Sequence, residues 1–332
     1  MIESPDSWSH NVVRSNLTNF NEICLQAFGW QWTNNPVYRQ FCAHLGITHP
    51  EQITSYEQIP YLPVELFKTQ KVYAAYQNPE KVFESSGTSQ SGNSRHYVRS
   101  LKIYEEVYLK IFESNFGPLK GHCVLGLLPS YLERENSSLI YMVKGLMKAS
   151  GHGLNGFFLY EQEALAQRIR ELEKKEKKYF LFGVSFALYD FAIRFALEMP
   201  HAVLIETGGM KGRRKEITRD ELHAHIQAGL QPGKLVSEYG MSELLSQAYS
   251  DESGLYATAP WMKISLAEIN DPFSQPKPGK TGLIQVIDLA NIYSCPFIRS
   301  SDLGKIHPDG RFEVLGRVDH SDTRGCSLLL AE

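Results

Sequence analysis

Apolar runs alternate with helical patterns between residues 122 and 230, and this alternation constrains the fold more than any other feature of the sequence. The runs "HCVLGLLP", "GFFLY", "KYFLFGVS" and "HAVLIETGG" are short and almost continuously apolar, which is typical of strands. Each is followed by a stretch with apolar residues at three- and four-residue intervals, which predicts a helix. Strands that are apolar throughout belong to a sheet covered on both faces, so the sequence predicts an α/β fold.

The patterns on either side of this segment are different. Residues 7–45 carry apolar side chains at helical spacing, and residues 97–117 predict a further helix that ends at a glycine. Beyond residue 255, "GLIQVIDLAN", "PFIRSSDLG" and "GRFEVLGRVD" predict short strands separated by turns. We therefore expect a helical N-terminal segment over 1–60 packed on the main domain, an α/β core over 61–255, and a small β-rich closing subdomain over 256–332.

The bulk properties of the 332-residue chain exclude several classes of function. Its net charge of −3 and its pI near 6.4 provide no electrostatic footprint for nucleic acid. No run approaches the roughly 18 apolar residues that cross a bilayer, and the N-terminus lacks the basic and apolar regions of a signal peptide. The dispersed cysteines, with no C-x-x-C pair, favour a reducing compartment. We expect a cytoplasmic protein with no membrane span.

The segment "FESSGTSQSGNSRHY" at 83–97 is the first candidate binding element. Its glycines and small side chains let backbone N–H groups turn inward and form a nest for phosphate oxygens, to which Thr88 and the serines would add hydroxyl donors. The helix expected behind it would direct its positive dipole end at such an anion. No lysine occurs between Lys81 and Lys102, which excludes a standard P-loop. Taken alone, the segment is more typical of a flexible surface turn.

The second candidate element is "ETGGMKGRRKE" at 206–216. It follows a predicted strand and places two glycines, and then four basic residues, at the carboxyl end of that strand. In open α/β sheets this is the edge where ligands bind. Because the first element lacks a lysine, Lys211, Arg213 and Arg214 are available to offset phosphate charge. The alternative of a solvated basic surface loop stays open.

Two acids have the chemistry of a nucleotide site. The run "SEYGMSE" at 237–243 ends in Glu243, a carboxylate suited to Mg²⁺ that bridges to phosphates. Asp302, in "SSDLG", has the acceptor oxygens that ribose hydroxyls need. Each acid, taken singly, is also typical of a solvated turn.

Two other patterns are weaker. The run "FGVSFA" at 182–187 nearly matches the nucleophile elbow of α/β-hydrolases, but Ala187 replaces its last glycine, which disfavours a hydrolase. His223 and His225 lie two residues apart on a predicted helix and point to different faces, so metal binding by this pair is disfavoured. We expect both histidines at the surface.

The order of these elements resembles the adenylate-forming superfamily, which includes acyl-CoA synthetases, firefly-type luciferases and peptide-synthetase adenylation domains. Its phosphate loop S-S-G-T-[TS] is matched by Ser85, Ser86, Gly87, Thr88 and Ser89, and its Y-G-x-[TS]-E motif by Tyr239, Gly240, Met241, Ser242 and Glu243. Its G-R-x-D motif is matched by Gly316, Arg317 and Asp319, and its T-G-D motif only in the acid, Asp302. The resemblance implies that the phosphate loop, Gly208, Gly209, residues 239–243, Asp302 and Arg317 bind ATP, with Mg²⁺ held by Glu243.

Within the superfamily, the sequence is similar to the acyl-protein synthetase branch, the fatty-acid activating subunit of the bacterial bioluminescence reductase complex. The similarity lies in "LPSYLERENSSLIYM", "ETGGMKGR" and a terminal "RGCSLL", and it is firmest over residues 60–330. The chain departs from the wider superfamily by lacking a lysine in the phosphate loop and by ending shortly after "GRVD", where other members continue into a lid domain. The resemblance implies a large domain with mixed sheets flanked by helices, a small β-rich C-terminal part and no C-terminal lid.

The activity that this resemblance implies is that of a ligase. With ATP and Mg²⁺ it would convert a carboxylic acid, a fatty acid above all, into an acyl-adenylate, assisted by Glu243, Lys211 and Arg213. An acyl-accepting partner enzyme, a reductase or a transferase, is expected. Two alternatives stay open: an acyl-CoA or carrier-protein ligase of the phenylacetate-CoA ligase type, and a nucleotide-binding relative without catalysis.

The implied acyl carrier is Cys326 in the terminal segment. Thioester formation needs a thiolate, and the nearby Arg324 would raise the thiolate fraction of this cysteine. The alternative is that Cys326 packs inward on a final strand. Cys295, in "YSCPF", is its competitor as acyl carrier. Cys24, Cys42 and Cys123 lie in apolar patterns and are expected in the core.

Overall fold

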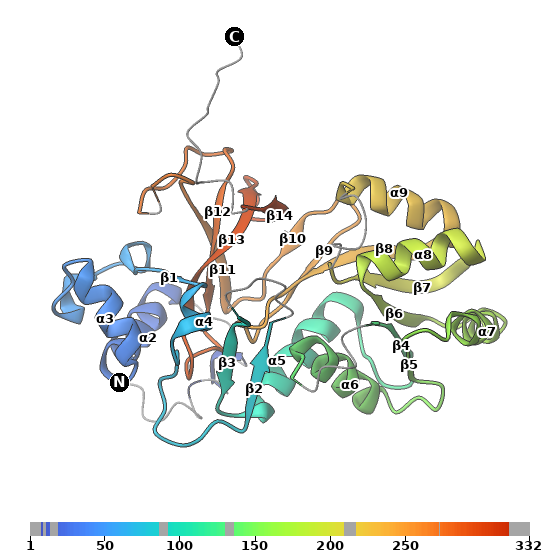
Figure 1. The fold of residues 1–332 in the computed structure, drawn as a ribbon, viewed down its shortest axis with the longest axis horizontal. Helices are drawn as coiled ribbons and strands as arrows, with labels where there is room; N and C mark the ends of the chain where they lie inside the picture. Colours follow the sequence, from blue (N-terminus) through green and yellow to red (C-terminus); the bar gives the residue numbers. More distant parts are fainter. Residues whose placement is uncertain are drawn as a thin grey trace, which may run out of the picture.

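The computed structural model describes residues 8, 11–13, 19–85, 92–129, 136–208, 217–271 and 273–318 (Figure 1). Its N-terminal part contains helices α2 (Phe20–Asn34) and α3 (Pro36–His44), the 3₁₀ turns η1 (Pro50–Gln52) and η2 (Tyr56–Gln58), strand β1 (Leu62–Pro63) and helix α4 (Leu66–Thr69). Asn35 begins α3, because its side chain accepts a hydrogen bond from the Tyr38 amide at 3.2 Å. The same side chain donates to the Ser294 carbonyl at 3.0 Å and so ties these helices to the C-terminal third of the chain.

The central part begins with a hairpin of β2 (Lys81–Glu84) and β3 (Arg95–Val98), followed by α5 (Leu101–Phe116). Then come β4 (Cys123–Leu127), α6 (Ser138–Ser150), β5 (Gly156–Phe158), α7 (Gln162–Glu173), β6 (Tyr179–Gly183), α8 (Ser185–Phe195), β7 (Met199–Glu206), α9 (Arg219–Leu230) and β8 (Pro232–Tyr239). This alternation is the predicted one. Strand β8 was not predicted, because its residues include Pro, Gly, Lys, Ser and Glu, which break up the apolar run.

The last described strands are β9 (Ala248–Ser250), β10 (Tyr256–Ala257), β11 (Met262–Ala267), β12 (Gly282–Asp288), β13 (Phe297–Ile306) and β14 (Phe312–Arg317). They join the central strands in one 12-stranded sheet in the order β11-β12-β13-β14-β10-β9-β8-β7-β6-β4-β5, with β1 paired to β13. Strands β4 to β8 pair in parallel, whereas β8 to β14 pair antiparallel. The predicted mixed sheet flanked by helices is confirmed, and the division into 1–60, 61–255 and 256–332 stays a prediction.

Helices cover both faces of the parallel strands. Figure 1 shows α8 and α9 on one face and α5 and α6 on the opposite one. On the α5 side, Phe112 packs edge-to-face on Phe180 of β6 with ring centroids 4.8 Å apart, and Phe116 packs on Tyr249 of β9 at 4.9 Å. On the other side, α8 and α9 are in close contact. A side chain at Gly229 of α9 would therefore collide with the Ala192 carbonyl oxygen of α8. The sheet is therefore buried on both faces, as its apolar strands predict.

The helix predicted over residues 97–117 is confirmed from Leu101 to its end at Gly117, but its predicted start directly behind the Ser/Gly segment is wrong. We expected a helix over residues 97–117 directly behind it, with the helix dipole aimed at an anion. Instead, the segment joins β2 to β3, and α5 begins only at Leu101, after β3. Residues 95–98 alternate between more exposed and buried positions and pair with β2, which outweighs their helical spacing. In the described part of the chain, no helix is long and apolar enough to span a membrane.

Candidate active site

The base of the β2–β3 hairpin fixes both ends of the Ser/Gly segment. Ser85 and Ser94 face each other there: the Ser94 amide donates to Ser85 Oγ at 3.0 Å, and the Ser85 amide donates to the Ser94 carbonyl at 3.1 Å. Ser86, Gly87, Thr88 and Ser89 lie outside the described residues. The Ser94 hydroxyl donates to the carboxylate of Glu243, which is 149 residues further along the chain. The Ser/Gly segment and the "YGMSE" motif are therefore neighbours.

Glu243 lies in the loop between β8 and β9, and the alternative of a solvated turn residue is wrong for it. Its residue is 6% exposed, and burial raises the pKa of its carboxyl group. Two side chains from another part of the chain hold this loop in place. Asn291 donates to the Glu243 carbonyl at 2.8 Å, and Asp288 accepts the amides of Leu245 and Ser246, each at 2.9 Å.

His96 of β3 holds the same loop from the hairpin side. Its Nδ1 lies 2.7 Å from the Ser242 carbonyl oxygen, and its Nε2 lies 2.9 Å from Oδ1 of Asn291. Burial lowers the pKa of this histidine to about 4, so the ring is neutral at physiological pH. His96, Asp288 and Asn291 were missed in the sequence because their partners are distant. The polar residues of "SGNSRHY" and "DLANIYS", set against apolar surroundings, were the available signal.

Asp302 and Arg317 form the next part of the site. They stand opposite each other on the antiparallel strands β13 and β14, and Arg317 Nε donates to Asp302 Oδ1 at 2.8 Å. The Tyr239 hydroxyl donates to Asp302 Oδ2 at 3.2 Å. Burial, and to a smaller extent the negative charge of the Asp302 carboxylate, raises the pKa of Tyr239. The phenol therefore stays protonated and acts as a donor. Asp302 is 8% exposed, so it is not a solvated turn residue.

The carboxyl end of β7 carries the glycine turn. Gly208 has a φ of +75°, a backbone conformation that favours glycine, and a side-chain carbon there would meet no heavy atom of the described residues within 4 Å. The Gly208 amide donates to Glu206 Oε1 at 2.7 Å. Gly240, in the next loop, lies against the Glu238 carboxylate. A side-chain carbon at Gly240 would lie only 2.3 Å from Glu238 Oε1. Gly209, Lys211, Arg213 and Arg214 lie outside the described residues.

Glu206 is the centre of a buried polar cluster that was not predicted. Its carboxylate accepts hydrogen bonds from the hydroxyls of Ser185 and of Ser237, the latter at 2.9 Å. His223 Nε2 lies 3.1 Å from Ser237 Oγ, so His223 is a half-buried residue of this cluster and not the surface histidine we expected. His225 is exposed, as predicted. Ser185 is 3% exposed and bound to Glu206, so it lacks the exposure that a hydrolase nucleophile needs.

The described cysteines are all in the core. Cys24, Cys42, Cys123 and Cys295 are at most 2% exposed, which confirms the prediction for the first three. Burial raises the pKa of the Cys24 and Cys42 thiols to about 12 and that of Cys123 to about 11, and it raises that of Cys295 as well. Cys295 is therefore a poor acyl carrier, because it is neither accessible nor ionised. Cys326 and Arg324 lie outside the described residues.

The donor set at this site fits a nucleotide with one bridging cation. No cluster of three or more acidic, histidine or cysteine side chains that could bind a metal occurs in the described ranges. A site that takes Mg²⁺ together with phosphates needs only one or two carboxylates, and Glu243 can supply one.

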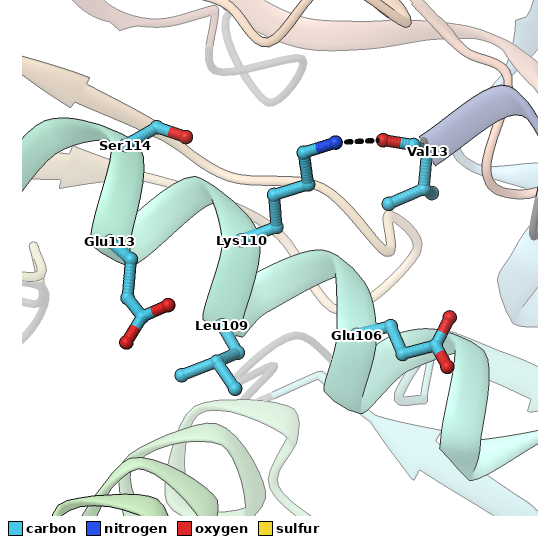
Figure 2. Close-up of a pocket in the computed structure, with 6 residues that line it drawn as sticks. All are labelled: Val13, Glu106, Leu109, Lys110, Glu113 and Ser114. Atoms are coloured by element: carbon cyan, nitrogen blue, oxygen red, sulfur yellow. Dashed lines mark hydrogen bonds between the residues drawn. The ribbon is translucent and has the colours of Figure 1, made fainter. Parts of the chain in front are cut away.

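Figure 2 shows a separate pocket on α5. There Lys110 donates to the Val13 carbonyl, and Glu106 and Glu113 lie on either side of Lys110. Among the predicted site residues that the structure describes, none lines that pocket.

Known proteins resemble this chain in sequence and in fold. No protein-family model matches the chain. A long-chain-fatty-acid–luciferin-component ligase of Vibrio harveyi is 24% identical over 356 aligned positions, which cover 99% of this chain and 91% of that protein. An open conformation of 2-hydroxyisobutyryl-CoA ligase with 2-HIB-AMP and CoA is 12% identical and covers 90% of this chain and 69% of its own, with a TM-score of 0.70. A structure of the same enzyme in the thioesterification state is also 12% identical. The match covers 96% of this chain and 70% of that enzyme, with a TM-score of 0.69.

The solved structures and the sequence match are ligases in both cases. The solved structures share the fold of this chain at low identity, and the Vibrio harveyi ligase matches it almost from end to end. Together they confirm the resemblance read from the sequence: the chain is similar over nearly its whole length to a fatty-acid ligase, and it shares its fold with adenylate-forming enzymes.

Proposed function

We propose that this protein activates a carboxylic acid of the fatty-acid class with ATP to form an acyl-adenylate. One observation carries the proposal: the Ser94–Glu243 hydrogen bond brings the base of the Ser/Gly segment to the "YGMSE" motif. The same motif begins with Tyr239, whose hydroxyl bonds to Asp302 of the Asp302–Arg317 pair. Elements that are distant in the sequence therefore meet around Tyr239 and Glu243.

Each group has a role that follows from its chemistry. A carboxylate oxygen of the acid attacks the α-phosphorus of ATP, the bond from that phosphorus to the bridging oxygen breaks, and pyrophosphate leaves with the electron pair. The amides and hydroxyls of residues 85–89, with Lys211 and Arg213, hold the phosphates and offset their charge. Glu243 would hold a Mg²⁺ ion, which would supply positive charge to offset that of the phosphates. Asp302, oriented by Arg317 and Tyr239, accepts the ribose hydroxyls.

ATP–pyrophosphate exchange tests this step. Labelled pyrophosphate should enter ATP only when Mg²⁺ and a suitable acid are both present. A screen over acids of different chain lengths then identifies the preferred acid. Absence of exchange with every acid would support the alternative of a non-catalytic nucleotide-binding relative.

We further propose that the acyl group passes to Cys326. The Cys326 thiolate would attack the acyl carbonyl, and AMP would leave as the carbon–oxygen bond to phosphate breaks. The burial of Cys24, Cys42, Cys123 and Cys295 supports this assignment, because it leaves Cys326 as the remaining thiol of the sequence.

Labelling tests the acyl carrier. With ATP, Mg²⁺ and labelled fatty acid, the protein should acquire label that hydroxylamine removes, and Cys326→Ser should abolish it while pyrophosphate exchange persists. Label that survives in Cys326→Ser would refute the carrier assignment. Label that forms only on added CoA would instead support the CoA-ligase alternative.

A further inference from the structure

Three polar side chains lie on strand β8, on strand β9 and directly before β9, beside the proposed nucleotide site. Glu238 and Tyr249 are directly opposite each other in the antiparallel β8–β9 ladder, so their side chains lie on the same face of the sheet. Gln247 precedes Tyr249 by two residues. The Glu238 carboxylate and the Gln247 side chain both border Gly240, since a side-chain carbon there would lie 2.3 Å from Glu238 Oε1 and 3.5 Å from Gln247 Cγ. The three groups therefore form one cluster.

Polar atoms in this cluster lack partners. The Tyr249 hydroxyl and Gln247 Oε1 are buried and have no hydrogen-bond partner among the described residues, although Tyr249 is only 2% and Gln247 only 5% exposed. The Gln247 amide donates to the Leu245 carbonyl at 3.0 Å, which fixes its orientation and makes the free atom an acceptor. The Tyr249 ring is held by Phe116 and Phe112, so its hydroxyl cannot turn away.

Glu238 completes the cluster. Within the described ranges its side chain makes no hydrogen bond or ion pair, and the residue is half-buried, so a ligand can reach it. Burial, and to a smaller extent the negative charge of the Glu206 carboxylate, raises the pKa of Glu238 to about 8. Buried polar groups are nearly always paired in folded proteins, so several unpaired groups on one face indicate that another molecule supplies the partner.

We propose that Glu238, Gln247 and Tyr249 bind a hydrogen-bond donor carried by the acid substrate itself, a hydroxyl or an amine on its chain. The proposal rests on the proposed function, because it concerns the acid that is adenylated. The position is suitable: Tyr239, the next residue of β8, points to the opposite face and binds Asp302, and Gln247 follows Glu243 in the same loop. A plain alkyl chain at this place would leave Gln247 and Tyr249 unpaired and would bind less well.

The test is ATP–pyrophosphate exchange with decanoate, with hydroxydecanoates that carry the hydroxyl on the second, third or terminal carbon, and with the corresponding aminodecanoates. In the wild-type protein, kcat/KM for at least one hydroxy or amino acid should exceed that for decanoate by about tenfold or more, as expected when a buried hydrogen-bonding group is left unpaired. A preference confined to the aminodecanoates would assign an ammonium group as the ligand. The Glu238→Gln substitution should then remove this preference.

The variant that isolates the cluster is Tyr249→Phe, which removes only an unpaired hydroxyl and should fold as the wild type does. It should bring the ratio of kcat/KM values close to one. Tyr73→Phe is the matched control, because the Tyr73 hydroxyl donates to the Gln77 carbonyl away from this cluster, and it should keep the wild-type preference. Equal kcat/KM for decanoate and all substituted acids, or a preference unchanged in Tyr249→Phe, overturns the inference and leaves adenylation standing. Absence of exchange with every acid overturns both.

Discussion

Replacement of Asp302 by asparagine is the most direct test of the proposed ribose contact. The substitution keeps the shape of the side chain and removes its charge. In the folded chain, Asp302 Oδ1 accepts from Arg317 Nε at 2.8 Å, and Oδ2 accepts from the Tyr239 hydroxyl at 3.2 Å. The Asp302 side chain is 12% exposed, whereas that of Arg317 is 50% exposed. The acid is therefore the buried partner, and its charge determines the strength of every hydrogen bond it accepts.

The magnitude follows from these contacts. A hydrogen bond to a charged group contributes about 1.5–3 kcal/mol, which corresponds to about tenfold to 150-fold in an equilibrium constant. Asparagine keeps one acceptor oxygen, so we expect Asp302→Asn to weaken ATP binding by about tenfold, at the lower end of that range. Because Arg317 is half exposed, screening limits the loss in the free energy of unfolding to about 1 kcal/mol. The protein should therefore stay folded while its nucleotide affinity falls.

Calorimetric titration with ATP and urea unfolding measure the two effects separately. Asp309→Asn is a matched control, because Asp309 accepts from Arg311 Nε at 2.7 Å on the same β13–β14 hairpin, but both side chains are exposed. It should leave ATP affinity and stability unchanged. An unchanged ATP affinity in folded Asp302→Asn, or an equal loss in Asp309→Asn, would refute the ribose assignment.

Three further predictions concern charge. Glu243→Gln should lower the rate of pyrophosphate exchange by about tenfold or more and change its dependence on Mg²⁺ concentration, and normal rates would contradict the metal role. Lys211→Ala and Arg213→Ala should each slow adenylate formation, and if both leave it intact the segment is a solvated loop. An acid whose pKa is higher in the folded than in the unfolded chain stabilises the fold below its unfolded pKa and loses that contribution as the pH rises. Because the pKa of Glu238 rises from 4.5 to about 8, the free energy of unfolding should decrease over that interval, and Glu238→Gln should decrease less; equal slopes would contradict the shift.

The fold was predictable where local pattern and packing agree. Strands β4, β6 and β7 are short apolar runs that the sheet buries on both faces, so their sequence reports their environment directly. The Ser/Gly segment behaved differently. Residues 95–98 have side chains that suit a helix or a strand, and pairing with residues 81–84 decided between the two. A pairing partner of this kind is a tertiary property that a local pattern does not contain.

The candidate site was predictable only in its motif residues. Tyr239, Glu243 and Asp302 were found because each belongs to a short motif. The groups that hold them were not found, because each acts over a long sequence separation: Ser94 contacts Glu243 across 149 residues, and His96 contacts Asn291 across 195. The residues next to a serine or a histidine in a polar segment do not indicate which distant residue it contacts.

The buried carboxylates of the site explain how its loops are held. Glu206, Glu243, Asp288 and Asp302 are each less than 9% exposed, and burial raises the pKa of Glu243 and Asp288, so ionising these two costs folding free energy. Stability alone does not account for such groups. Each one instead accepts hydrogen bonds from a loop or strand end of the site: the Gly208 turn, Ser94, residues 245–246 and the Tyr239 hydroxyl. Glu206 thus holds the turn that directly follows it, whereas Glu243, Asp288 and Asp302 each hold a segment that is distant in the sequence. Removing one of these last three acids should disturb that distant segment.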